Sequence, residues 1–103
     1  MNDKELADRL VQAGFKEGGF GYWIPGTSTQ CNASLFVRDP RVAMACMNQL
    51  LHSLQEQSVI VIGDRKPISV ATMDWNDRIT DLAENDCLER AICEAYVKAM
   101  EGE

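Results

Sequence analysis

The sequence lacks long apolar runs and has a single histidine, and both shortages exclude classes of protein. No apolar run approaches the roughly 20 residues that a membrane-spanning helix needs. The lone His52 and four cysteines without a C-x-x-C pair offer no usual set of zinc ligands. His52 also has no evident orienting partner that would make it a base for a nucleophilic cysteine. We therefore expect neither a membrane span nor a structural zinc site.

Motifs of the common enzyme classes are absent too. The sequence contains no G-x-S-x-G, no Walker loop and no dinucleotide-binding glycine fingerprint after a strand. Its glycine-rich segment, FKEGGFG at residues 15–21, precedes a predicted strand, so it offers no helix N-terminus to a phosphate. We expect a protein that is not an enzyme and that needs no cofactor.

The composition is that of an ordinary globular protein. The 103 residues are 46% hydrophobic and 25% charged, with 7 glycines and 3 prolines, which predicts a single domain with a modest core. Met1–Glu5 has neither the basic start nor the apolar middle of a signal peptide, so we expect a cytoplasmic protein. Cys31, Cys46, Cys87 and Cys93 are then expected to be reduced and buried.

The first half of the chain predicts a helix followed by a hairpin. Asn2 with Glu5 three residues on is typical of a capping box that begins a helix, and Gly14 is placed to end it. The aromatic run 20–24, bounded by glycines and a proline, predicts a strand, and residues 32–38 predict the second strand of the same hairpin.

The clearest signal is Asp39-Pro40, an N-cap aspartate before a proline at the first helical position. The helix is expected to run to about Glu56. Its predicted buried face comprises Ala43, Met47, Leu50, Leu51 and Leu54. Its predicted solvent face comprises Arg41, Asn48, Gln49, His52 and Gln55.

The second half predicts another hairpin and a final helix. The β-branched run 58–62 is apolar on both faces, which favours a central strand, and residues 68–73 pair with it across a turn. Asn85 or Asp86 is expected to cap the last helix. The predicted buried face of that helix comprises Leu88, Ile92, Ala95, Tyr96 and Ala99.

The element order α-ββ-α-ββ-α predicts an α+β fold, in which a four-stranded, mainly antiparallel sheet packs with three helices. Because the middle strands are apolar on both faces, we expect helices on both sides of the sheet, as in an α/β/α sandwich. Edge strands of such a sheet need cover, which makes a homodimer an open expectation.

Negative charge is concentrated in one stretch, DWNDRITDLAEND at residues 74–86. It holds five acids and one base, giving a net charge of −4 out of −6 for the chain, whereas residues 1–73 are neutral. A protein charged in this way is not expected to bind duplex DNA directly. It suits a basic partner, including a protein that itself binds nucleic acid.

The acidic stretch does not match a calcium-binding loop. Counted from Asp74, the fifth position is Arg78 and the sixth is Ile79, where an EF-hand needs an oxygen ligand and a glycine. A cation held by Asp74, Asp77 and Asp81 is a weaker alternative. The simpler interpretation is a solvated connection, held to the core by the apolar residues Trp75, Ile79 and Leu82.

A second candidate site would bind an anion. Arg38 and Arg41 flank the start of the helix at Asp39-Pro40, where backbone N–H groups favour negative charge, and Tyr22 or Trp23 would stack on a base. Arg65 and Lys66 are further cationic candidates. The competing interpretation is that Arg38 and Arg41 form surface ion pairs.

Aromatic and methionine side chains have two interpretations in this sequence. Tyr22, Trp23 and Trp75 are expected in or beside the core, and any of them that is exposed would mark an interface. Met44, Met47 and Met73 are expected to fill the core.

Three segments carry a resemblance to a known family. LERAICEAYVKAM (residues 88–100), YWIPG and DPRVAMACMNQLL resemble, respectively, the closing helix, first hairpin and central helix of small phage proteins of the ABA-sandwich type, and more distantly NinX-type phage proteins. The resemblance covers about half of the chain and contains no catalytic signature. It implies a phage or prophage accessory protein acting in a bacterial host cell.

Together these observations lead to one main hypothesis and two alternatives. The main hypothesis is a non-enzymatic inhibitor of a host defence factor, of the anti-CRISPR type, that binds its target through Asp74, Trp75, Asp77, Asp81, Glu84 and Asp86. One alternative is a sponge that sequesters a nucleotide second messenger through the cationic candidates and Tyr22. The other is a phage accessory protein without an antidefence role.

Overall fold

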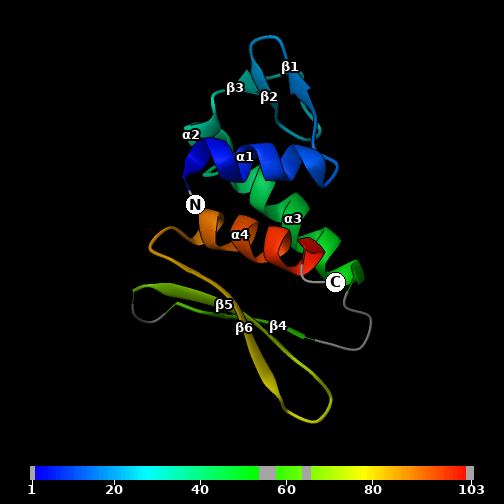
Figure 1. Ribbon diagram of the computed structural model, residues 1–103, viewed down its shortest axis with the longest axis vertical. Helices are drawn as coiled ribbons and strands as arrows, with labels where there is room; N and C mark the ends of the chain where they lie inside the picture. Colours follow the sequence, from blue (N-terminus) through cyan, green and yellow to red (C-terminus); the bar gives the residue numbers. More distant parts are fainter. Residues whose placement is uncertain (1, 54–57, 64–65, 102–103) are drawn as a thin grey trace.

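The computed structural model describes residues 2–53, 58–63 and 66–101 of the chain. They form an α+β fold with four helices and two separate three-stranded antiparallel sheets (Figure 1). The elements are α1 (Asp3–Gln12), β1 (Glu17–Gly18), β2 (Gly21–Trp23), β3 (Gln30–Cys31), α2 (Ala33–Phe36), α3 (Pro40–Ser53), β4 (Ser58–Ile62), β5 (Ile68–Met73), β6 (Ile79–Asn85) and α4 (Leu88–Glu101). The prediction of one four-stranded sheet is therefore wrong.

Helix α1 begins and ends as its sequence predicts. The Asn2 side chain accepts a 2.7 Å hydrogen bond from the Glu5 backbone N–H. After the last turn, Gly14 adopts a φ of 127°, a conformation that a residue with a side chain rarely takes. Local sequence chemistry fixes both ends of this helix.

The first hairpin is much shorter than predicted, because residues 32–38 do not form a strand. The Asn32 side chain accepts a 2.9 Å hydrogen bond from the Leu35 N–H and begins the short helix α2. That helix turns Phe36 and Val37 into the core, where both are fully buried. Only Gln30–Cys31 remains to pair with β2, and the small sheet gains its third strand from Glu17–Gly18.

Helix α3 begins at Pro40, as predicted, where the Asp39 carboxylate accepts a 2.8 Å hydrogen bond from the Arg41 N–H. Its buried face is centred on Val42, Ala43, Cys46 and Leu50. Leu51 lies about 100° around the helix from Leu50 and is exposed, so its predicted burial is wrong. The expected end near Glu56, with Leu54 and Gln55, falls outside the described residues.

Methionine and polar residues of α3 divide between solvent and the core margin. Met44 is exposed rather than buried as expected, whereas Met47 packs against the core. The predicted solvent residues of the described helix, Arg41, Asn48, Gln49 and His52, are all exposed.

The large sheet has the order β4-β5-β6, so β5 is its central strand and the prediction of a central β4 is wrong. The pairing of residues 58–62 with residues 68–73 is confirmed, with Ile60 opposite Ala71. The third strand, β6, lies inside the acidic stretch that we interpreted as a solvated connection.

A β-bulge explains why the sequence hides β6. Val70 pairs with Ala83 and Ala71 pairs with Asp81, so Leu82 is the extra residue. Leu82 and Ala83 both pack against the core. The bulge thus breaks the alternation of apolar and polar residues by which a strand is recognised.

Helix α4 packs over β6 and β5 and against α3, and closes the core. The Asn85 side chain accepts a 3.0 Å hydrogen bond from the Cys87 N–H just before the helix begins. Ile92, Ala95 and Tyr96 are buried as predicted and Ala99 packs at the margin, but Leu88 is exposed.

The helices lie between the two sheets, with the small sheet at one end of an elongated molecule of 46 × 28 × 21 Å and the large sheet at the other (Figure 1). Within the described part of the chain, the large sheet carries helices on one face only, so the predicted α/β/α sandwich is not formed there. No helix within the described ranges combines the length and apolar character needed to cross a membrane.

Candidate partner-binding surface

The first five residues of the acidic stretch form the turn between β5 and β6. The Asp74 C=O accepts a 3.0 Å hydrogen bond from the Asp77 N–H, and the Asp74 N–H donates a 3.1 Å bond to the Arg78 C=O. Asp77 follows with a φ of 61°, in the left-handed region. This is the geometry of a three-residue hairpin loop, in which a tight turn is followed by a residue in the left-handed region.

The Asp74 side chain stabilises the same turn from within. Its Oδ1 accepts hydrogen bonds from the N–H groups of Asn76, at 2.9 Å, and Arg78, at 3.0 Å. The carboxylate of Asp74 therefore acts as an internal acceptor, and it positions the three loop residues that follow.

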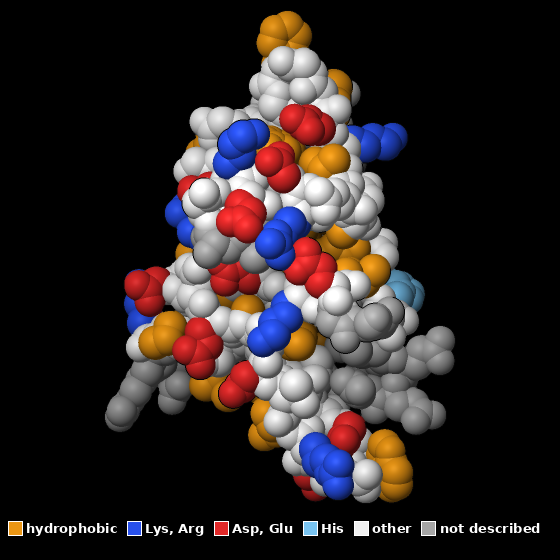
Figure 2. Space-filling view, in the orientation of Figure 1, with side chains coloured by type: hydrophobic (Ala, Val, Ile, Leu, Met, Phe, Trp, Pro, Cys, Tyr) orange, Lys and Arg blue, Asp and Glu red, His pale blue; other side chains and the backbone are white. Residues whose placement is uncertain are grey.

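Trp75 lies at the tip of this turn and is 78% exposed. The expectation that Trp75 and Ile79 hold the stretch to the core is wrong, since Ile79 is exposed as well, and only Leu82 reaches the core. The hydrogen bonds within the turn hold the loop without any contribution from the indole. Figure 2 shows apolar side chains protruding at both ends of the molecule.

Asp81 and Glu84 share the face of the large sheet that points away from α4. They pair with Ala71 and Ser69, two residues apart on β5, and side chains two apart in a strand lie on one face. The intervening Val70 belongs to the core cluster on the α4 side. Asp81 and Glu84 are exposed, and no ion pair engages either of them within the described part of the chain.

The six predicted contact residues therefore form a stripe rather than a compact patch. Asp74, Trp75 and Asp77 lie in the turn, Asp81 and Glu84 follow along β6, and the exposed Asp86 lies beyond the far end of the strand. A seven-residue strand spans roughly 20 Å, so Trp75 and Asp86 lie far apart. We call the segment Asp74–Glu84 the acidic hairpin.

The open face of the large sheet adds apolar residues that sequence reasoning missed. Ile60, Ile62, Met73 and Ile79 share this face with Asp81 and Glu84 by the strand register. Because residues 59–62 are all apolar, the sequence does not distinguish the two faces of this strand, and the expected second helical layer assigned both of them to the core.

The cationic candidates are not brought together. Arg38 donates a 2.8 Å hydrogen bond to Asp3 in α1, and Arg41 pairs with Asp39 at 2.9 Å, so the predicted ion-pair interpretation is confirmed for both. These bonds hold the pKa values of Asp3 and Asp39 below their usual range. Lys66 is exposed in a different part of the chain, and Arg65 lies outside the described residues.

Tyr22 is also committed to the interior. Its ring is buried and stacks on Phe36 at a centroid distance of 5.1 Å, and its hydroxyl donates a 2.6 Å hydrogen bond to Asp8. Burial, followed by the bond to Asp8, raises the pKa of Tyr22 to about 12. The ring thus presents no free face on which a nucleotide base would stack. Trp23 is half-buried.

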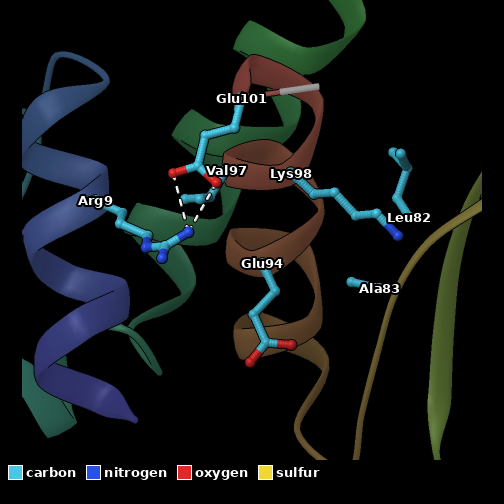
Figure 3. Close-up of a pocket in the computed structure, with 7 residues that line it drawn as sticks. All are labelled: Arg9, Leu82, Ala83, Glu94, Val97, Lys98 and Glu101. Atoms are coloured by element: carbon cyan, nitrogen blue, oxygen red, sulfur yellow. Dashed lines mark hydrogen bonds and ion pairs between the residues drawn. The ribbon is translucent and has the colours of Figure 1, made fainter. Parts of the chain in front are cut away.

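A groove of about 480 Å³ separates α1, α4 and β6 (Figure 3). Leu82, Ala83 and Val97 form its apolar lining, and Arg9 reaches across it to Glu101 at 2.8 Å. Glu94 and Lys98 also line it, so charges of both signs surround a small apolar floor.

Among the described residues, no group of histidine, cysteine, aspartate and glutamate side chains is arranged to hold a metal ion.

The four cysteines are free thiols, as predicted, but the expected burial is wrong for Cys31 and Cys87. Cys46 and Cys93 are buried between α3 and α4, whereas Cys31 and Cys87 are only half-buried.

Comparison with known proteins adds no family to these observations, since no family model, no curated protein and no solved structure matches the chain.

Proposed function

We propose that this protein is a non-enzymatic binding protein that uses the acidic hairpin to occupy a basic surface on a partner protein. The observation that carries the proposal is Trp75, 78% exposed at the tip of a turn that the Asp74 carboxylate holds in shape. Tryptophan is among the side chains that most often dominate the energy of a protein interface. An exposed tryptophan with no packing role in its own domain is therefore the strongest contact candidate.

The electrostatics of the hairpin support a basic partner. The acidic hairpin has four acids and one base, a net charge of −3, and Asp86 beyond it brings residues 74–86 to −4. Asp81 and Glu84 are exposed on one face of the sheet. Such a field speeds association with a positively charged surface and disfavours nucleic acid itself. Because the turn and the strand pairing are already formed, binding would cost little ordering of the backbone.

The resemblance to small phage proteins suggests the biological setting. A phage protein in the cytoplasm of its bacterial host meets defence nucleases, whose nucleic-acid channels are basic. We propose a CRISPR-type nuclease complex as the target, with the acidic hairpin entering a surface that normally binds nucleic acid.

Capture from the bacterial host, followed by binding to the purified nuclease complex, tests the proposal. We expect the immobilised protein to retain one nuclease complex and to inhibit its cleavage of DNA. Trp75→Ala and Asp81→Lys should each weaken the binding at least about tenfold, the change that 1.4 kcal/mol produces.

Two matched variants control for exposure and charge. Phe20 is 90% exposed at the opposite end of the molecule, so Phe20→Ala removes an equally free aromatic ring. Glu17→Lys in β1 changes the net charge by the same amount as Asp81→Lys. Both controls should bind as the unaltered protein does. Full inhibition by Trp75→Ala and Asp81→Lys would rule out the acidic hairpin as the contact surface.

A further inference from the structure

The large sheet has two edges of opposite character. Strand β4 pairs only with β5 within the described ranges, and its residues, Ser58-Val59-Ile60-Val61-Ile62, carry no charge. Val61 is 41% exposed on the α4 side of the sheet, because α4 packs over β6 and β5 rather than over β4, and Ile62 is 47% exposed on the open face. A neutral, β-branched edge strand is a ready template for pairing with another strand.

The other edge carries the features by which proteins prevent such pairing. Strand β6 has a bulge at Leu82, and its exposed Asp81 and Glu84 place negative charge along it. Bulges and edge charges both oppose the addition of a strand. The contrast identifies β4 as the edge that is left open to a partner.

The sequence of β4 complements itself. When two copies run antiparallel about a two-fold axis at Ile60, Val59 lies opposite Val61 of the other copy, and Ser58 lies opposite Ile62. The two residues of each pair point to the same face of the sheet, so both faces continue across the junction. Opposed β-branched pairs of this kind stabilise antiparallel strands.

We infer that two copies of this chain pair antiparallel through β4, forming a dimer with one continuous six-stranded sheet. The charge distribution favours this edge, since each chain carries a net charge of −6. Pairing through β6 would bring Asp81 and Glu84 of two copies together, whereas pairing through β4 keeps the two acidic hairpins on opposite edges. The open faces of the two sheets then join, so Ile60 and Ile62 of both copies pack side by side.

Edge-specific lysine substitutions test the dimer. Ile62 and Ile79 are both exposed isoleucines on the open face, one on each edge strand, so Ile62→Lys and Ile79→Lys form a matched pair. Sedimentation equilibrium of the full chain should show a dimer for the unaltered protein and for Ile79→Lys. Ile62→Lys and Val61→Lys should each raise the dissociation constant about 100-fold, because the two-fold axis places every change in the interface twice.

Hydrogen exchange on the unaltered protein gives a reading that does not depend on how variants fold. Raising the protein concentration should slow amide exchange in residues 58–62 and leave residues 79–85 unchanged. A monomer at all concentrations, or an equal loss of the dimer in Ile62→Lys and Ile79→Lys, would overturn the inference. The test is also separate from target binding, since Trp75 lies outside the β4 pairing.

Discussion

The hydroxyl of Tyr22 in β2 donates a 2.6 Å hydrogen bond to the carboxylate of Asp8 in α1. The Tyr22 ring stacks on Phe36 of α2, and Phe36 in turn meets Phe15 edge to face at 5.7 Å. Strands of two or three residues do not form a stable sheet alone. This contact therefore attaches the small sheet to the helical layer.

Tyr22→Phe tests the strength of that attachment. The change keeps the ring and removes a bond to a charged acceptor, so we expect the free energy of unfolding to fall by about 1.5 kcal/mol. Urea denaturation measures the loss. Tyr96→Phe is the matched control, because the Tyr96 hydroxyl makes a longer, 3.3 Å bond to the neutral Ala13 C=O. A larger loss in Tyr96→Phe would contradict the assigned role of Asp8.

The same tyrosine predicts how stability depends on alkaline pH. Its pKa is raised to about 12 in the folded protein, whereas the pKa of an unfolded tyrosine is about 10. Between these values the unfolded chain loses the proton and the folded chain keeps it, so stability falls as pH rises. Urea midpoints above pH 10 should decline less steeply in Tyr22→Phe than in the unaltered protein.

The carboxylate of Asp3 predicts that stability falls as pH decreases in acid, the reverse of the dependence on alkaline pH. The hydrogen bond from Arg38 lowers the pKa of Asp3, and the charges of Arg38 and Arg90 act in the same direction. The stability that this carboxylate contributes is present above about pH 4, the value for an unfolded aspartate, and is lost as pH falls through the lowered pKa. Asp3→Asn should therefore flatten the decline of the melting temperature in acid. An unchanged decline would show that Asp3 does not contribute to it.

Helix ends were predictable because one or two neighbouring residues determine them. Asn2 caps α1 and Asp39 begins α3 through bonds to N–H groups three and two residues away. The division into two sheets was not predictable in the same way, because each sheet joins strands that are neighbours in the chain, and no local signal shows whether two such sets of strands pair with each other. Asn32 shows the ambiguity, since its cap converts a predicted strand into α2.

The acidic stretch was recognised from its charge, but its structure was predicted wrongly, since it contains β6 rather than only a solvated connection. The charge count marked residues 74–86, and the failed calcium pattern excluded one role for them. Leu82, as a bulge residue, concealed the strand. The turn that presents Trp75 is held by the hydrogen bonds of Asp74, which no hydrophobic pattern reveals.

The β5–β6 turn should gain stability from a glycine at its left-handed position. Asp77 has a φ of 61°, which glycine adopts without steric cost, so Asp77→Gly should raise the free energy of unfolding by about 0.5 kcal/mol. Asp77→Asn separates conformation from charge, because asparagine tolerates this region and is neutral. Asp74→Ala, which removes two acceptor bonds, should lower stability by about 1 kcal/mol. Thermal unfolding of the three variants at one pH compares them directly.

The Sγ atoms of Cys46 and Cys93 lie 3.9 Å apart between α3 and α4, and the Cys93 thiol donates in turn to the Val37 C=O at 3.8 Å. The hydrogen bond to Cys93, together with burial, raises the pKa of Cys46. The Cys46 thiol therefore ionises less readily and is shielded from reagents, and both effects slow its reaction. Titration with an aromatic disulfide reagent should therefore modify Cys31 and Cys87 first. Cys46 and Cys93 should react only when denaturant opens the helix pair, at a rate that follows unfolding. Mass spectrometry of partly modified protein identifies the sites, and early labelling of Cys46 or Cys93 would contradict the packing of α3 on α4.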